Sequence, residues 1–326
     1  MSEPPLAPGA IDTHAHVYPD AYLDLLERGG RDPETTRIAR GMGAGSGEAE
    51  IAARLALMDR AGVGVQVLAA TPQSPSLADP EDAARAARWI NDEYLRLQAA
   101  HPDRFLIYLA LPLPHVAESL AELTRLLDGP EPAAGVVGVS LPTVLPDGTV
   151  PADPRLDPVW EDLDRRGLVV NLHPTGSGAG SPLIADHGLA WVNGAPVEDA
   201  TAVLQLMAAD HLRRFPRARL HVAHLGGDLP FLAQRLEDNH EDWGQFPASP
   251  RTMLRQIHYD AANFHEPSLA MTAETVGAEQ ILAGSDFPYF QDAKYVRAFE
   301  YVRTSRLSPT ERDGVLGANA RRLYGL

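Results

Sequence analysis

Cysteine is absent from the 326-residue sequence, and lysine occurs only once, at Lys294. Without cysteine the chain forms no disulfide and offers no thiolate ligand, so a bound metal must rest on His, Asp or Glu. No stretch approaches the roughly 18 apolar residues that a bilayer crossing needs. The N-terminal sequence MSEPPLAPGA also lacks the basic and apolar regions of a signal peptide, so we expect a cytoplasmic protein with no membrane partner.

Basic residues are also outnumbered, because the chain has 28 Lys and Arg against 44 Asp and Glu, a formal net charge of -16. This balance argues against binding to a phosphate backbone, and we expect no nucleic-acid partner. The apolar fraction of 44% and the charged fraction of 22% are typical of a soluble globular protein. The length allows one large domain, so we expect a single domain over residues 1–326 with an N-terminal tail over residues 1–9.

Apolar, β-branched runs recur along the whole chain and predict eight strands. Their nearly continuous hydrophobicity is typical of strands that are covered on both faces, as in a parallel sheet wrapped by helices. The predicted strands cover residues 10–16, 63–71, 104–113, 136–143, 168–176, 219–227, 256–264 and 281–288.

Amphipathic segments separate these runs. Residues 48–62 and 80–103, for example, carry apolar residues at helical spacing and end near Gly or Pro, the expected stop signals. Strand and helix alternating eight times predict a (β/α)8 TIM barrel. The alternative is a doubly wound open sheet, but no glycine-rich dinucleotide fingerprint follows the first strand.

Two segments depart from this alternation. Residues 28–50 are rich in Gly, Arg and small polar residues, which is consistent with a flexible linker or with a mobile lid over the barrel. We favour the lid. Residues 175–199 form a long loop after the fifth strand, too long for a plain connection, and are a candidate substrate wall or subunit contact.

His14 and His16 lie two residues apart in the first predicted strand. Alternate residues of a strand share a face, so both imidazoles point the same way, a geometry that suits metal chelation as well as two half-exposed histidines on an edge strand. Active sites of such barrels gather at the C-terminal ends of the strands. His173, His224 and Asp286 stand at the ends of the fifth, sixth and eighth predicted strands, so we expect all five side chains to converge.

Each of these residues also has a purely structural interpretation. His173 fits a hydrogen-bonded core histidine, and Asp286 fits a helix N-cap. His221 and His224 are expected to point to opposite faces of their strand, so that only one of them looks into the barrel, and the HLGG turn favours His224. The other histidines are expected to be surface or core residues, namely residues 101, 115, 187, 211, 240, 258 and 265.

This set of motifs resembles the amidohydrolase superfamily. The likeness rests on HAH at residues 14–16, the lone His173, AHLGG at 223–227 and GSDFP at 284–288. Within the superfamily the chain is most similar to the branch that includes aminocarboxymuconate semialdehyde decarboxylase and γ-resorcylate decarboxylase. Further support comes from the strings ALPLP (110–114), FPRARLHVAHLGGDLPFLAQRLE (215–237) and NARRLYGL (319–326).

The resemblance implies one divalent metal ion, bound by His14, His16 and His173 with Asp286 as fourth ligand or close partner. Zn²⁺ is the expected ion, with Mn²⁺ or Fe²⁺ as alternatives, and no organic cofactor is expected. His224 would be the general acid or base, with Asp286 as its partner. Superfamily members with two metals use a lysine at the end of strand four, and no lysine stands there, so a mononuclear site is expected.

The branch implies non-oxidative decarboxylation of a small aromatic or unsaturated carboxylic acid, by a homodimer. The alternatives are hydrolysis or hydration of an amide, lactone or related ring compound by metal-bound water, and a barrel kept only as a binding module. An anionic substrate favours a guanidinium contact, for which the lid supplies the candidates. The candidate substrate contacts are Arg31, Arg37, Arg40, Trp191, Phe287 and Tyr289, with core packing as the alternative for Phe287 and a dimer contact for Trp191.

Overall fold

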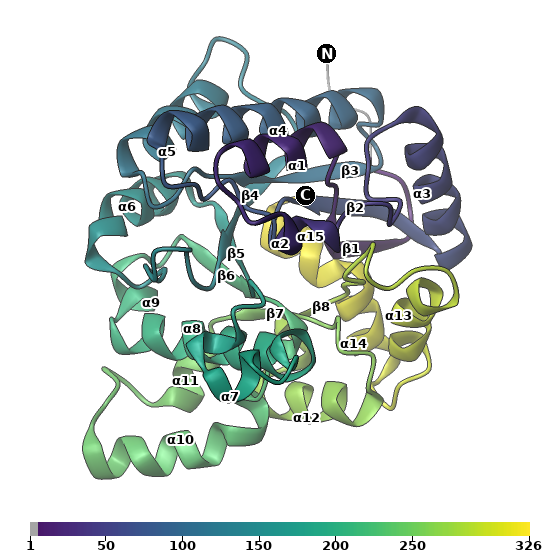
Figure 1. The fold of residues 1–326 in the computed structure, drawn as a ribbon. Coiled ribbons are helices and arrows are strands. Elements are labelled where there is room, and N and C mark those ends of the chain that lie inside the picture. The colour runs from purple at the N-terminus through teal and green to yellow at the C-terminus, as the bar shows by residue number, and fades with distance from the viewer. Residues whose placement is uncertain (1–5) are drawn as a thin grey trace.

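The computed structural model describes residues 6–326, whose eight strands are hydrogen-bonded in chain order, each parallel to the next (Figure 1). The alternation of strands and helices confirms the predicted (β/α)8 barrel. The strands are β1 (Ala10–His16), β2 (Val63–Ala69), β3 (Phe105–Ala110), β4 (Val136–Pro142), β5 (Val169–His173), β6 (Arg219–Val222), β7 (His258–Asp260) and β8 (Ile281–Leu282).

Backbone hydrogen bonds between the segment after β8 and β1 close the ring. Thr13 N donates to the Ala283 carbonyl oxygen at 2.9 Å, and Asp286 N donates to the His14 carbonyl oxygen at 2.8 Å. His16 N in turn donates to the Phe287 carbonyl oxygen at 2.8 Å. Asp286 is therefore fixed by the backbone beside both histidines of β1.

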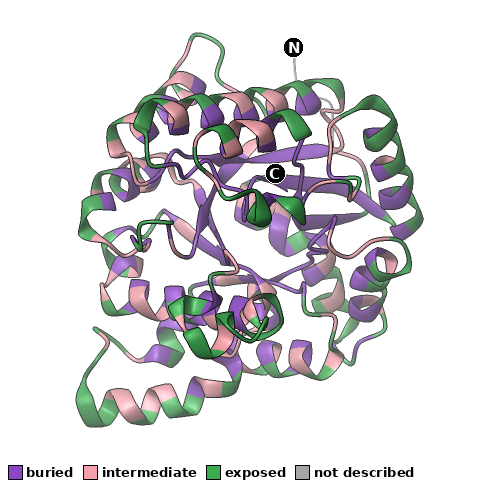
Figure 2. Cartoon of the chain, in the orientation of Figure 1, coloured by how far each residue is buried: buried purple, intermediate pink, exposed green. Residues whose placement is uncertain are grey.

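Helices surround the barrel, and each exposes one face to solvent while the strands inside are buried (Figure 2). α4 begins where Asp79 accepts hydrogen bonds from the backbone N–H groups of Glu81 and Asp82, and α3 ends at Gly62 in the left-handed conformation. The helices are α1 (Asp20–Arg28), α2 (Pro33–Arg37), α3 (Glu48–Ala61), α4 (Pro80–Ala100), α5 (Val116–Leu127), α6 (Asp157–Arg166), α7 (Pro182–Ala185), α8 (Ala195–Ala208), α9 (His211–Arg214), α10 (Leu229–Trp243), α11 (Pro250–Leu254), α12 (Glu266–Val276), α13 (Ala293–Arg303), α14 (Pro309–Asp313) and α15 (Asn319–Tyr324).

The first strand matches its predicted bounds, whereas the other seven are shorter than predicted, the last four most clearly. Beyond the ends of β6 and β8 the backbone departs from strand geometry, and His224 and Asp286 adopt positive φ angles of +54° and +56°. The predicted long loop 175–199 is also partly helical: it contains α7 and the first turn of α8. These departures place side chains over the mouth of the barrel.

The C-terminal helix α15 closes the other end of the barrel. Its residues Ala320 and Leu323 pack in one buried cluster with Ile11, Leu106 and Val137, which stand near the amino-terminal ends of their strands. In Figure 1, α15 lies near the centre of the ring of strands. Among the described residues, no helix combines the length and apolar character that a membrane crossing requires.

Candidate metal centre

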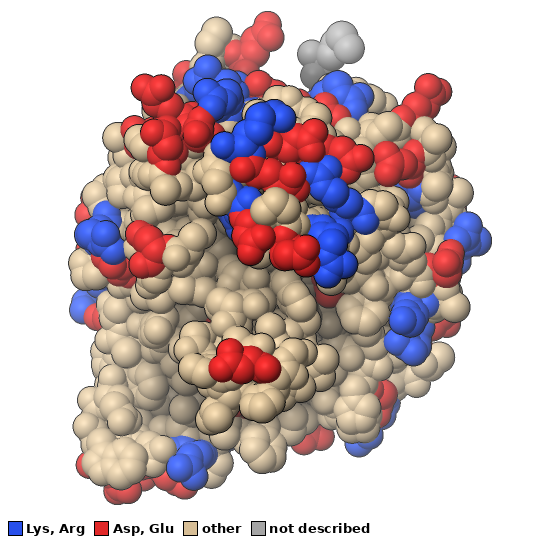
Figure 3. Space-filling view, in the orientation of Figure 1, with Lys and Arg blue, Asp and Glu red and all other residues tan. Residues whose placement is uncertain are grey.

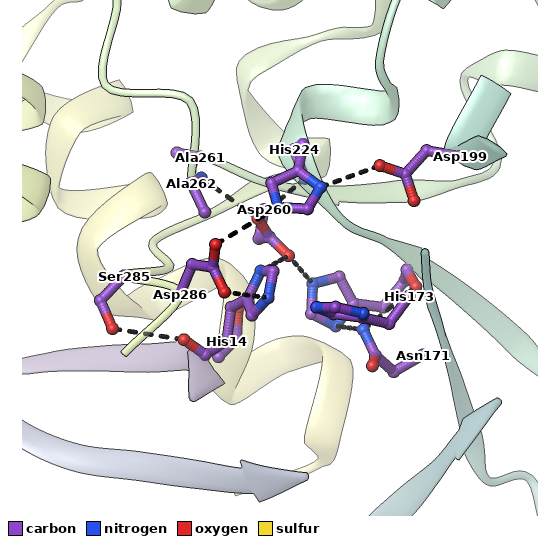
Figure 4. A network of polar contacts seen from close by, with 12 residues as sticks. His14, Asn171, His173, Asp199, His224, Asp260, Ala261, Ala262, Ser285 and Asp286 are labelled. Atoms are coloured by element: carbon purple, nitrogen blue, oxygen red, sulfur yellow. Dashed lines mark hydrogen bonds and ion pairs between the residues drawn. The ribbon is translucent and has the colours of Figure 1, made fainter. Parts of the chain in front are cut away.

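Four side chains meet at the carboxyl ends of the strands: His14 and His16 from β1, His173 from β5, and Asp286 after β8. Their ligand atoms all lie within 4.8 Å of one another. Asp286 Oδ1 is 3.2 Å from His16 Nε2 and 3.4 Å from His14 Nε2 (Figure 4). The structure thus brings together the residues that the strand-end pattern predicted.

Hydrogen bonds define which nitrogen of two of these imidazoles is free. His173 Nδ1 donates to the Pro174 carbonyl oxygen at 2.7 Å, and His14 Nδ1 donates to Asp260 Oδ2 at 2.9 Å, so Nε2 of each ring is the nitrogen left to face the cluster. Both Nε2 atoms are buried without a hydrogen-bond partner among residues 6–326. Buried polar atoms are rarely left unpaired, and three imidazoles with one carboxylate suit Zn²⁺, Mn²⁺ or Fe²⁺. The donor set therefore fits a divalent metal ion.

The electrostatics of the cluster also favour a cation. Burial lowers the pKa of His16 to about 4, and burial with the neighbouring imidazoles holds the pKa of His173 well below its usual value. Both rings are therefore neutral at neutral pH. Burial would raise the pKa of the Asp286 carboxyl, but the imidazoles of His14, His16 and His224 hold it well below its usual range. An ionised carboxylate thus faces the neutral rings of His16 and His173, whereas, despite burial, the carboxylates of Asp260 and Asp286 raise the pKa of His14 to about 10. A cation bound here would take the place of the proton on His14 Nε2.

His224 stands at the edge of the cluster, in a left-handed turn directly after β6. Its Nδ1 is 2.9 Å from Asp199 Oδ2, and its Nε2 is 3.7 Å from Asp286 Oδ2. Burial alone would lower the pKa of His224, but these two carboxylates hold it well above its usual value. Asp199 therefore holds the Nδ1 side of the ring, and Nε2 points toward the cluster.

Sequence reasoning missed Asp199, the partner of His224. No chemical role was predicted for Asp199, which lies in the first turns of α8 and is fully buried. The preceding residue, Glu198, accepts hydrogen bonds from the backbone N–H of Thr175 at 2.7 Å and from the Thr143 hydroxyl at 2.9 Å. One helix thus holds both the acid–base histidine and the loop after β5.

The expectation that only one of His221 and His224 looks into the barrel is wrong. His221 is fully buried and its Nε2 donates to Asp260 Oδ2 at 3.1 Å, while His224 lies over the mouth. The alternation of faces fails because β6 ends at Val222 and the backbone then turns into the left-handed region. Both imidazoles consequently belong to one network.

Asp260, which ends β7, is the centre of this network and was also missed (Figure 4). Its carboxylate accepts four hydrogen bonds: from His14 Nδ1, His221 Nε2 and the backbone N–H groups of His224 and Ala262, at 2.9 to 3.1 Å. The predicted seventh strand extended to residue 264, so the sequence did not mark Asp260 as a strand end.

Gly284 shows how closely the segment after β8 approaches the cluster. A Cβ atom on this glycine would lie 2.9 Å from the Cβ of His14 and 3.0 Å from the Cβ of Asp260. Real Cβ atoms essentially never approach this closely, so a side chain here would push a candidate metal ligand or its partner out of place.

A buried arginine, Arg54 of α3, supports the cluster from behind. Its Nη2 donates to the His16 carbonyl oxygen and its Nη1 to Gln66 Oε1, both at 2.7 Å. Its guanidinium carbon lies 4.4 Å from the centre of the Phe287 ring. Gln66 Nε2 then donates to the buried carboxylate of Asp12 at 2.8 Å. Arg54 therefore ties together β1 and the segment that carries Asp286.

The three lid arginines lie in different environments. Arg31 Nη2 donates to the carbonyl oxygens of Ser74 and Ser76, at 2.7 and 3.2 Å, beside a cavity. Arg37 is exposed and pairs with Glu34. Arg40 pairs with acidic residues of α1, at 2.7 to 3.3 Å. Arg37 and Arg40 pair with acidic residues of α1 and α2, and neither lines the cavity beside Arg31.

Two of the three aromatic candidates lie beside the metal cluster, and the third is packed in the protein core. Tyr289 has its ring centre 5.8 Å from that of His16, and Trp191 stacks on Tyr289 with 6.5 Å between ring centres. These two rings form a wall beside the cluster. Phe287 does not belong to this wall, because it is buried under Arg54 and packs edge-on against Tyr295. The prediction of a substrate contact at Phe287 is therefore replaced by core packing.

A cavity of about 730 Å³ opens on the same face, between α1–α2 and the loops after β2, β4 and β5. Arg31, Thr143, Thr175 and Glu198 line it, whereas none of the cluster residues does. Figure 3 shows the hollowed face below the charged residues of α1 and α2. Because Thr175 follows His173 by two residues, the cavity lies next to the candidate metal centre.

A parallel barrel with a His and Asp cluster at its mouth defines a TIM-barrel protein with a candidate metal centre. Residues 11–326 match the amidohydrolase family, and the chain belongs to it. It is 26% identical to 2-amino-3-carboxymuconate-6-semialdehyde decarboxylase of Dictyostelium discoideum, over 97% of this chain and 91% of that protein. It is 28% identical to γ-resorcylate decarboxylase of Rhizobium radiobacter, over 84% and 86%.

The fold is also that of a solved structure. The crystal structure of a dihydroxybenzoic acid decarboxylase from Polaromonas, with bound manganese and the inhibitor 2-nitroresorcinol, matches with a TM-score of 0.81 at 22% identity. The match covers 98% of this chain and 97% of that one. These relatives confirm the branch that the motifs of strands one, five, six and eight suggested.

Proposed function

We propose that this chain is a metal-dependent, non-oxidative decarboxylase that acts on a small aromatic or unsaturated carboxylic acid. The observation that carries the proposal is the position of His224, whose Nε2 lies 3.7 Å from Asp286 Oδ2 at the edge of a cluster of three imidazoles and one carboxylate. A proton donor beside a cation site is what replacement of a carboxylate by hydrogen requires. The decarboxylase relatives support the same reaction class.

His14, His16, His173 and Asp286 would hold one divalent ion, and the reaction would need no organic cofactor. Zn²⁺ is our expectation, with Mn²⁺ or Fe²⁺ as alternatives. The manganese bound in the Polaromonas enzyme supports Mn²⁺ as one of them. When bound, the ion would act as a Lewis acid that orients the oxygen atoms of the substrate.

The residues of the chain carry out the proton transfer. His224 delivers the proton from Nε2 to the carbon that bears the carboxylate. The bond between that carbon and the carboxylate then breaks, its electron pair returns to the unsaturated system, and carbon dioxide leaves. Asp199 holds Nδ1–H at 2.9 Å throughout, so that Nε2 keeps its direction toward the cluster.

The wall and the cavity would select the substrate. Trp191 and Tyr289 offer stacked faces for a planar ring. Arg31 offers a cation on the cavity wall for an anionic or hydroxyl substituent. Arg37 and Arg40 would contribute only after movement of the segment 28–50 as a lid, which would separate them from their acidic partners.

We further propose a cytoplasmic homodimer. Large apolar side chains are exposed in the segment after β5 and on α10, which is typical of a subunit contact. They are Leu183, Leu189, Trp191, Val192 and Phe231. Light scattering of the purified protein measures the oligomeric state directly, and a monomer at micromolar concentration would contradict this part of the proposal.

Metal analysis followed by incubation with hydroxybenzoates and aminomuconate-type acids tests the reaction. Release of carbon dioxide supports a carboxy-lyase, whereas turnover of amides or lactones without carbon dioxide would establish the hydrolytic alternative. His224→Asn should keep the metal and lose turnover, because it removes only the proton donor. His16→Ala should lose both metal and turnover, which separates the two roles.

A further inference from the structure

A chain of buried polar side chains runs from the candidate metal centre through the barrel to α15. Starting from His14, it passes to Asp260 at 2.9 Å, to His221 at 3.1 Å, to the Tyr108 hydroxyl at 2.9 Å and to the Tyr324 hydroxyl at 2.6 Å. The interior of such barrels is ordinarily filled by branched aliphatic side chains. A continuous row of hydrogen-bonded polar side chains in this interior is therefore unusual and suggests a function.

The chemistry of the groups along this path determines which atom donates and which accepts in each hydrogen bond. Because Asp260 accepts four N–H groups, it is an ionised acceptor, and His14 Nδ1 and His221 Nε2 both carry hydrogen. His221 Nδ1 is then the acceptor, to which the Tyr108 hydroxyl donates at 2.9 Å and the Asn171 amide at 3.3 Å. The Tyr108 oxygen in turn accepts from the Tyr324 hydroxyl. The path thus holds His14 by Nδ1, and His14 Nε2 is the ring nitrogen that faces the cluster.

The far end of the path lies in the helix that closes the barrel. Tyr324 is half-buried and packs with Leu323 in the cluster that joins α15 to the amino-terminal ends of the strands. Tyr108 is fully buried in the same cluster. The hydrogen bonds therefore connect a residue near the C-terminus to a ring at the opposite end of the barrel.

We propose that this path positions the His14 imidazole, so that His221, Tyr108 and Tyr324 are positioning residues for the metal ligand. Asp260 fixes the ring directly, His221 fixes Asp260, and the two tyrosines fix the tautomer of His221. Partners of this kind orient a ligating histidine and raise metal affinity. The inference rests on the proposed metal site, and it does not depend on which reaction the site catalyses.

Co²⁺ binding measures the effect without relying on activity. We expect His221→Leu to weaken Co²⁺ affinity by about tenfold or more, Tyr108→Phe by about threefold to tenfold, and Tyr324→Phe by about threefold. The visible absorption of the Co²⁺ protein should change in the same order, because the ligand field senses the orientation of the ring. His221→Gln keeps an N–H donor near the Nε2 position and should restore part of the affinity.

Tyr259→Phe is the matched control, since it removes a buried hydroxyl that donates to the Leu254 carbonyl oxygen and lies on β7 beside Asp260. It should bind Co²⁺ as the wild type does. Equal losses in Tyr259→Phe and Tyr108→Phe, or wild-type affinity and spectrum in both Tyr108→Phe and His221→Gln, would overturn the inference. A wild type that takes up no Co²⁺ would instead overturn the proposed metal site. Tyr108→Phe and His221→Gln also carry the test if His221→Leu does not fold.

Discussion

Replacement of Arg54 by Met tests how the candidate metal centre is supported. The change removes two charge-assisted hydrogen bonds, to the His16 carbonyl oxygen and to Gln66, and the contact with the Phe287 ring. It also leaves Asp12 without the buried cation to which Gln66 links it. Removing one partner of such a buried arrangement costs about 3–5 kcal/mol of unfolding free energy.

This cost converts into a measurable melting temperature. An unfolding entropy of about 2.1 cal/mol/K per residue gives about 0.7 kcal/mol/K for 326 residues, so Tm should fall by about 4–7 °C. Scanning calorimetry or circular dichroism measures the shift. Because Arg54 joins β1 to the segment of Asp286, metal content after dialysis should fall as well.

Arg85→Met is the control, because Arg85 is an exposed arginine that pairs with Asp82 within one helix. Exposed pairs of this kind contribute little, so its Tm should stay within about 1 °C of the wild type. An Arg54→Met protein with unchanged Tm and full metal content would refute the reasoning, since the buried guanidinium would then hold neither the fold nor the cluster.

Three further predictions concern the acid–base residue, pH and the metal. Asp199→Asn should lower kcat by roughly 100-fold with little change in KM or metal content, because His224 loses the carboxylate that orients it; steady-state kinetics with an intact kcat would contradict this role. Burial lowers the pKa of His211 to about 4, below its value of about 6.5 in the unfolded chain. The folded state therefore takes up a proton less readily than the unfolded chain, and the free energy of unfolding falls by up to about 3 kcal/mol as the pH drops from 6.5 to 4. His211→Leu should therefore lose less stability between pH 6.5 and 4 than the wild type does in urea titrations, and identical pH profiles would exclude this contribution. Adding the metal ion to the apoprotein at 100 times its Kd should raise the free energy of unfolding by about 2.7 kcal/mol, or Tm by about 4 °C, and a chelator should reverse the gain. A Tm that changes with neither the metal nor the chelator would rule out a metal site in the folded state.

The barrel and much of its centre follow from local pattern. The period of two in HAH placed His14 and His16 on one face, and the ends of apolar runs located His173 and Asp286. Strand ends carry this information because parallel strands all terminate at one rim of the barrel. The fold was predicted from this pattern and the family branch from the resemblance of the motifs, and both are confirmed.

The supporting residues could not be predicted in the same way. β7 has only three residues, too few for a periodic signal that would mark Asp260 as a strand end. Asp199 lies near the start of an amphipathic segment, and its partner His224 reaches it only through a left-handed turn that the hydrophobic pattern does not reveal. Arg54 lies within an amphipathic helix, where a charged residue is normally assigned to the solvent side.

The neighbouring carboxylates of α8 make substrate choice and acid catalysis mechanically dependent on each other. Glu198 anchors the strand-five loop at Thr175, and Asp199 one peptide later aims the proton donor. Any slide or rotation of this helix to admit a bulkier ring would also swing the imidazole off its target. Altered selectivity in this lineage should therefore arise from changes at loop tips such as Trp191, with the helix itself left in place.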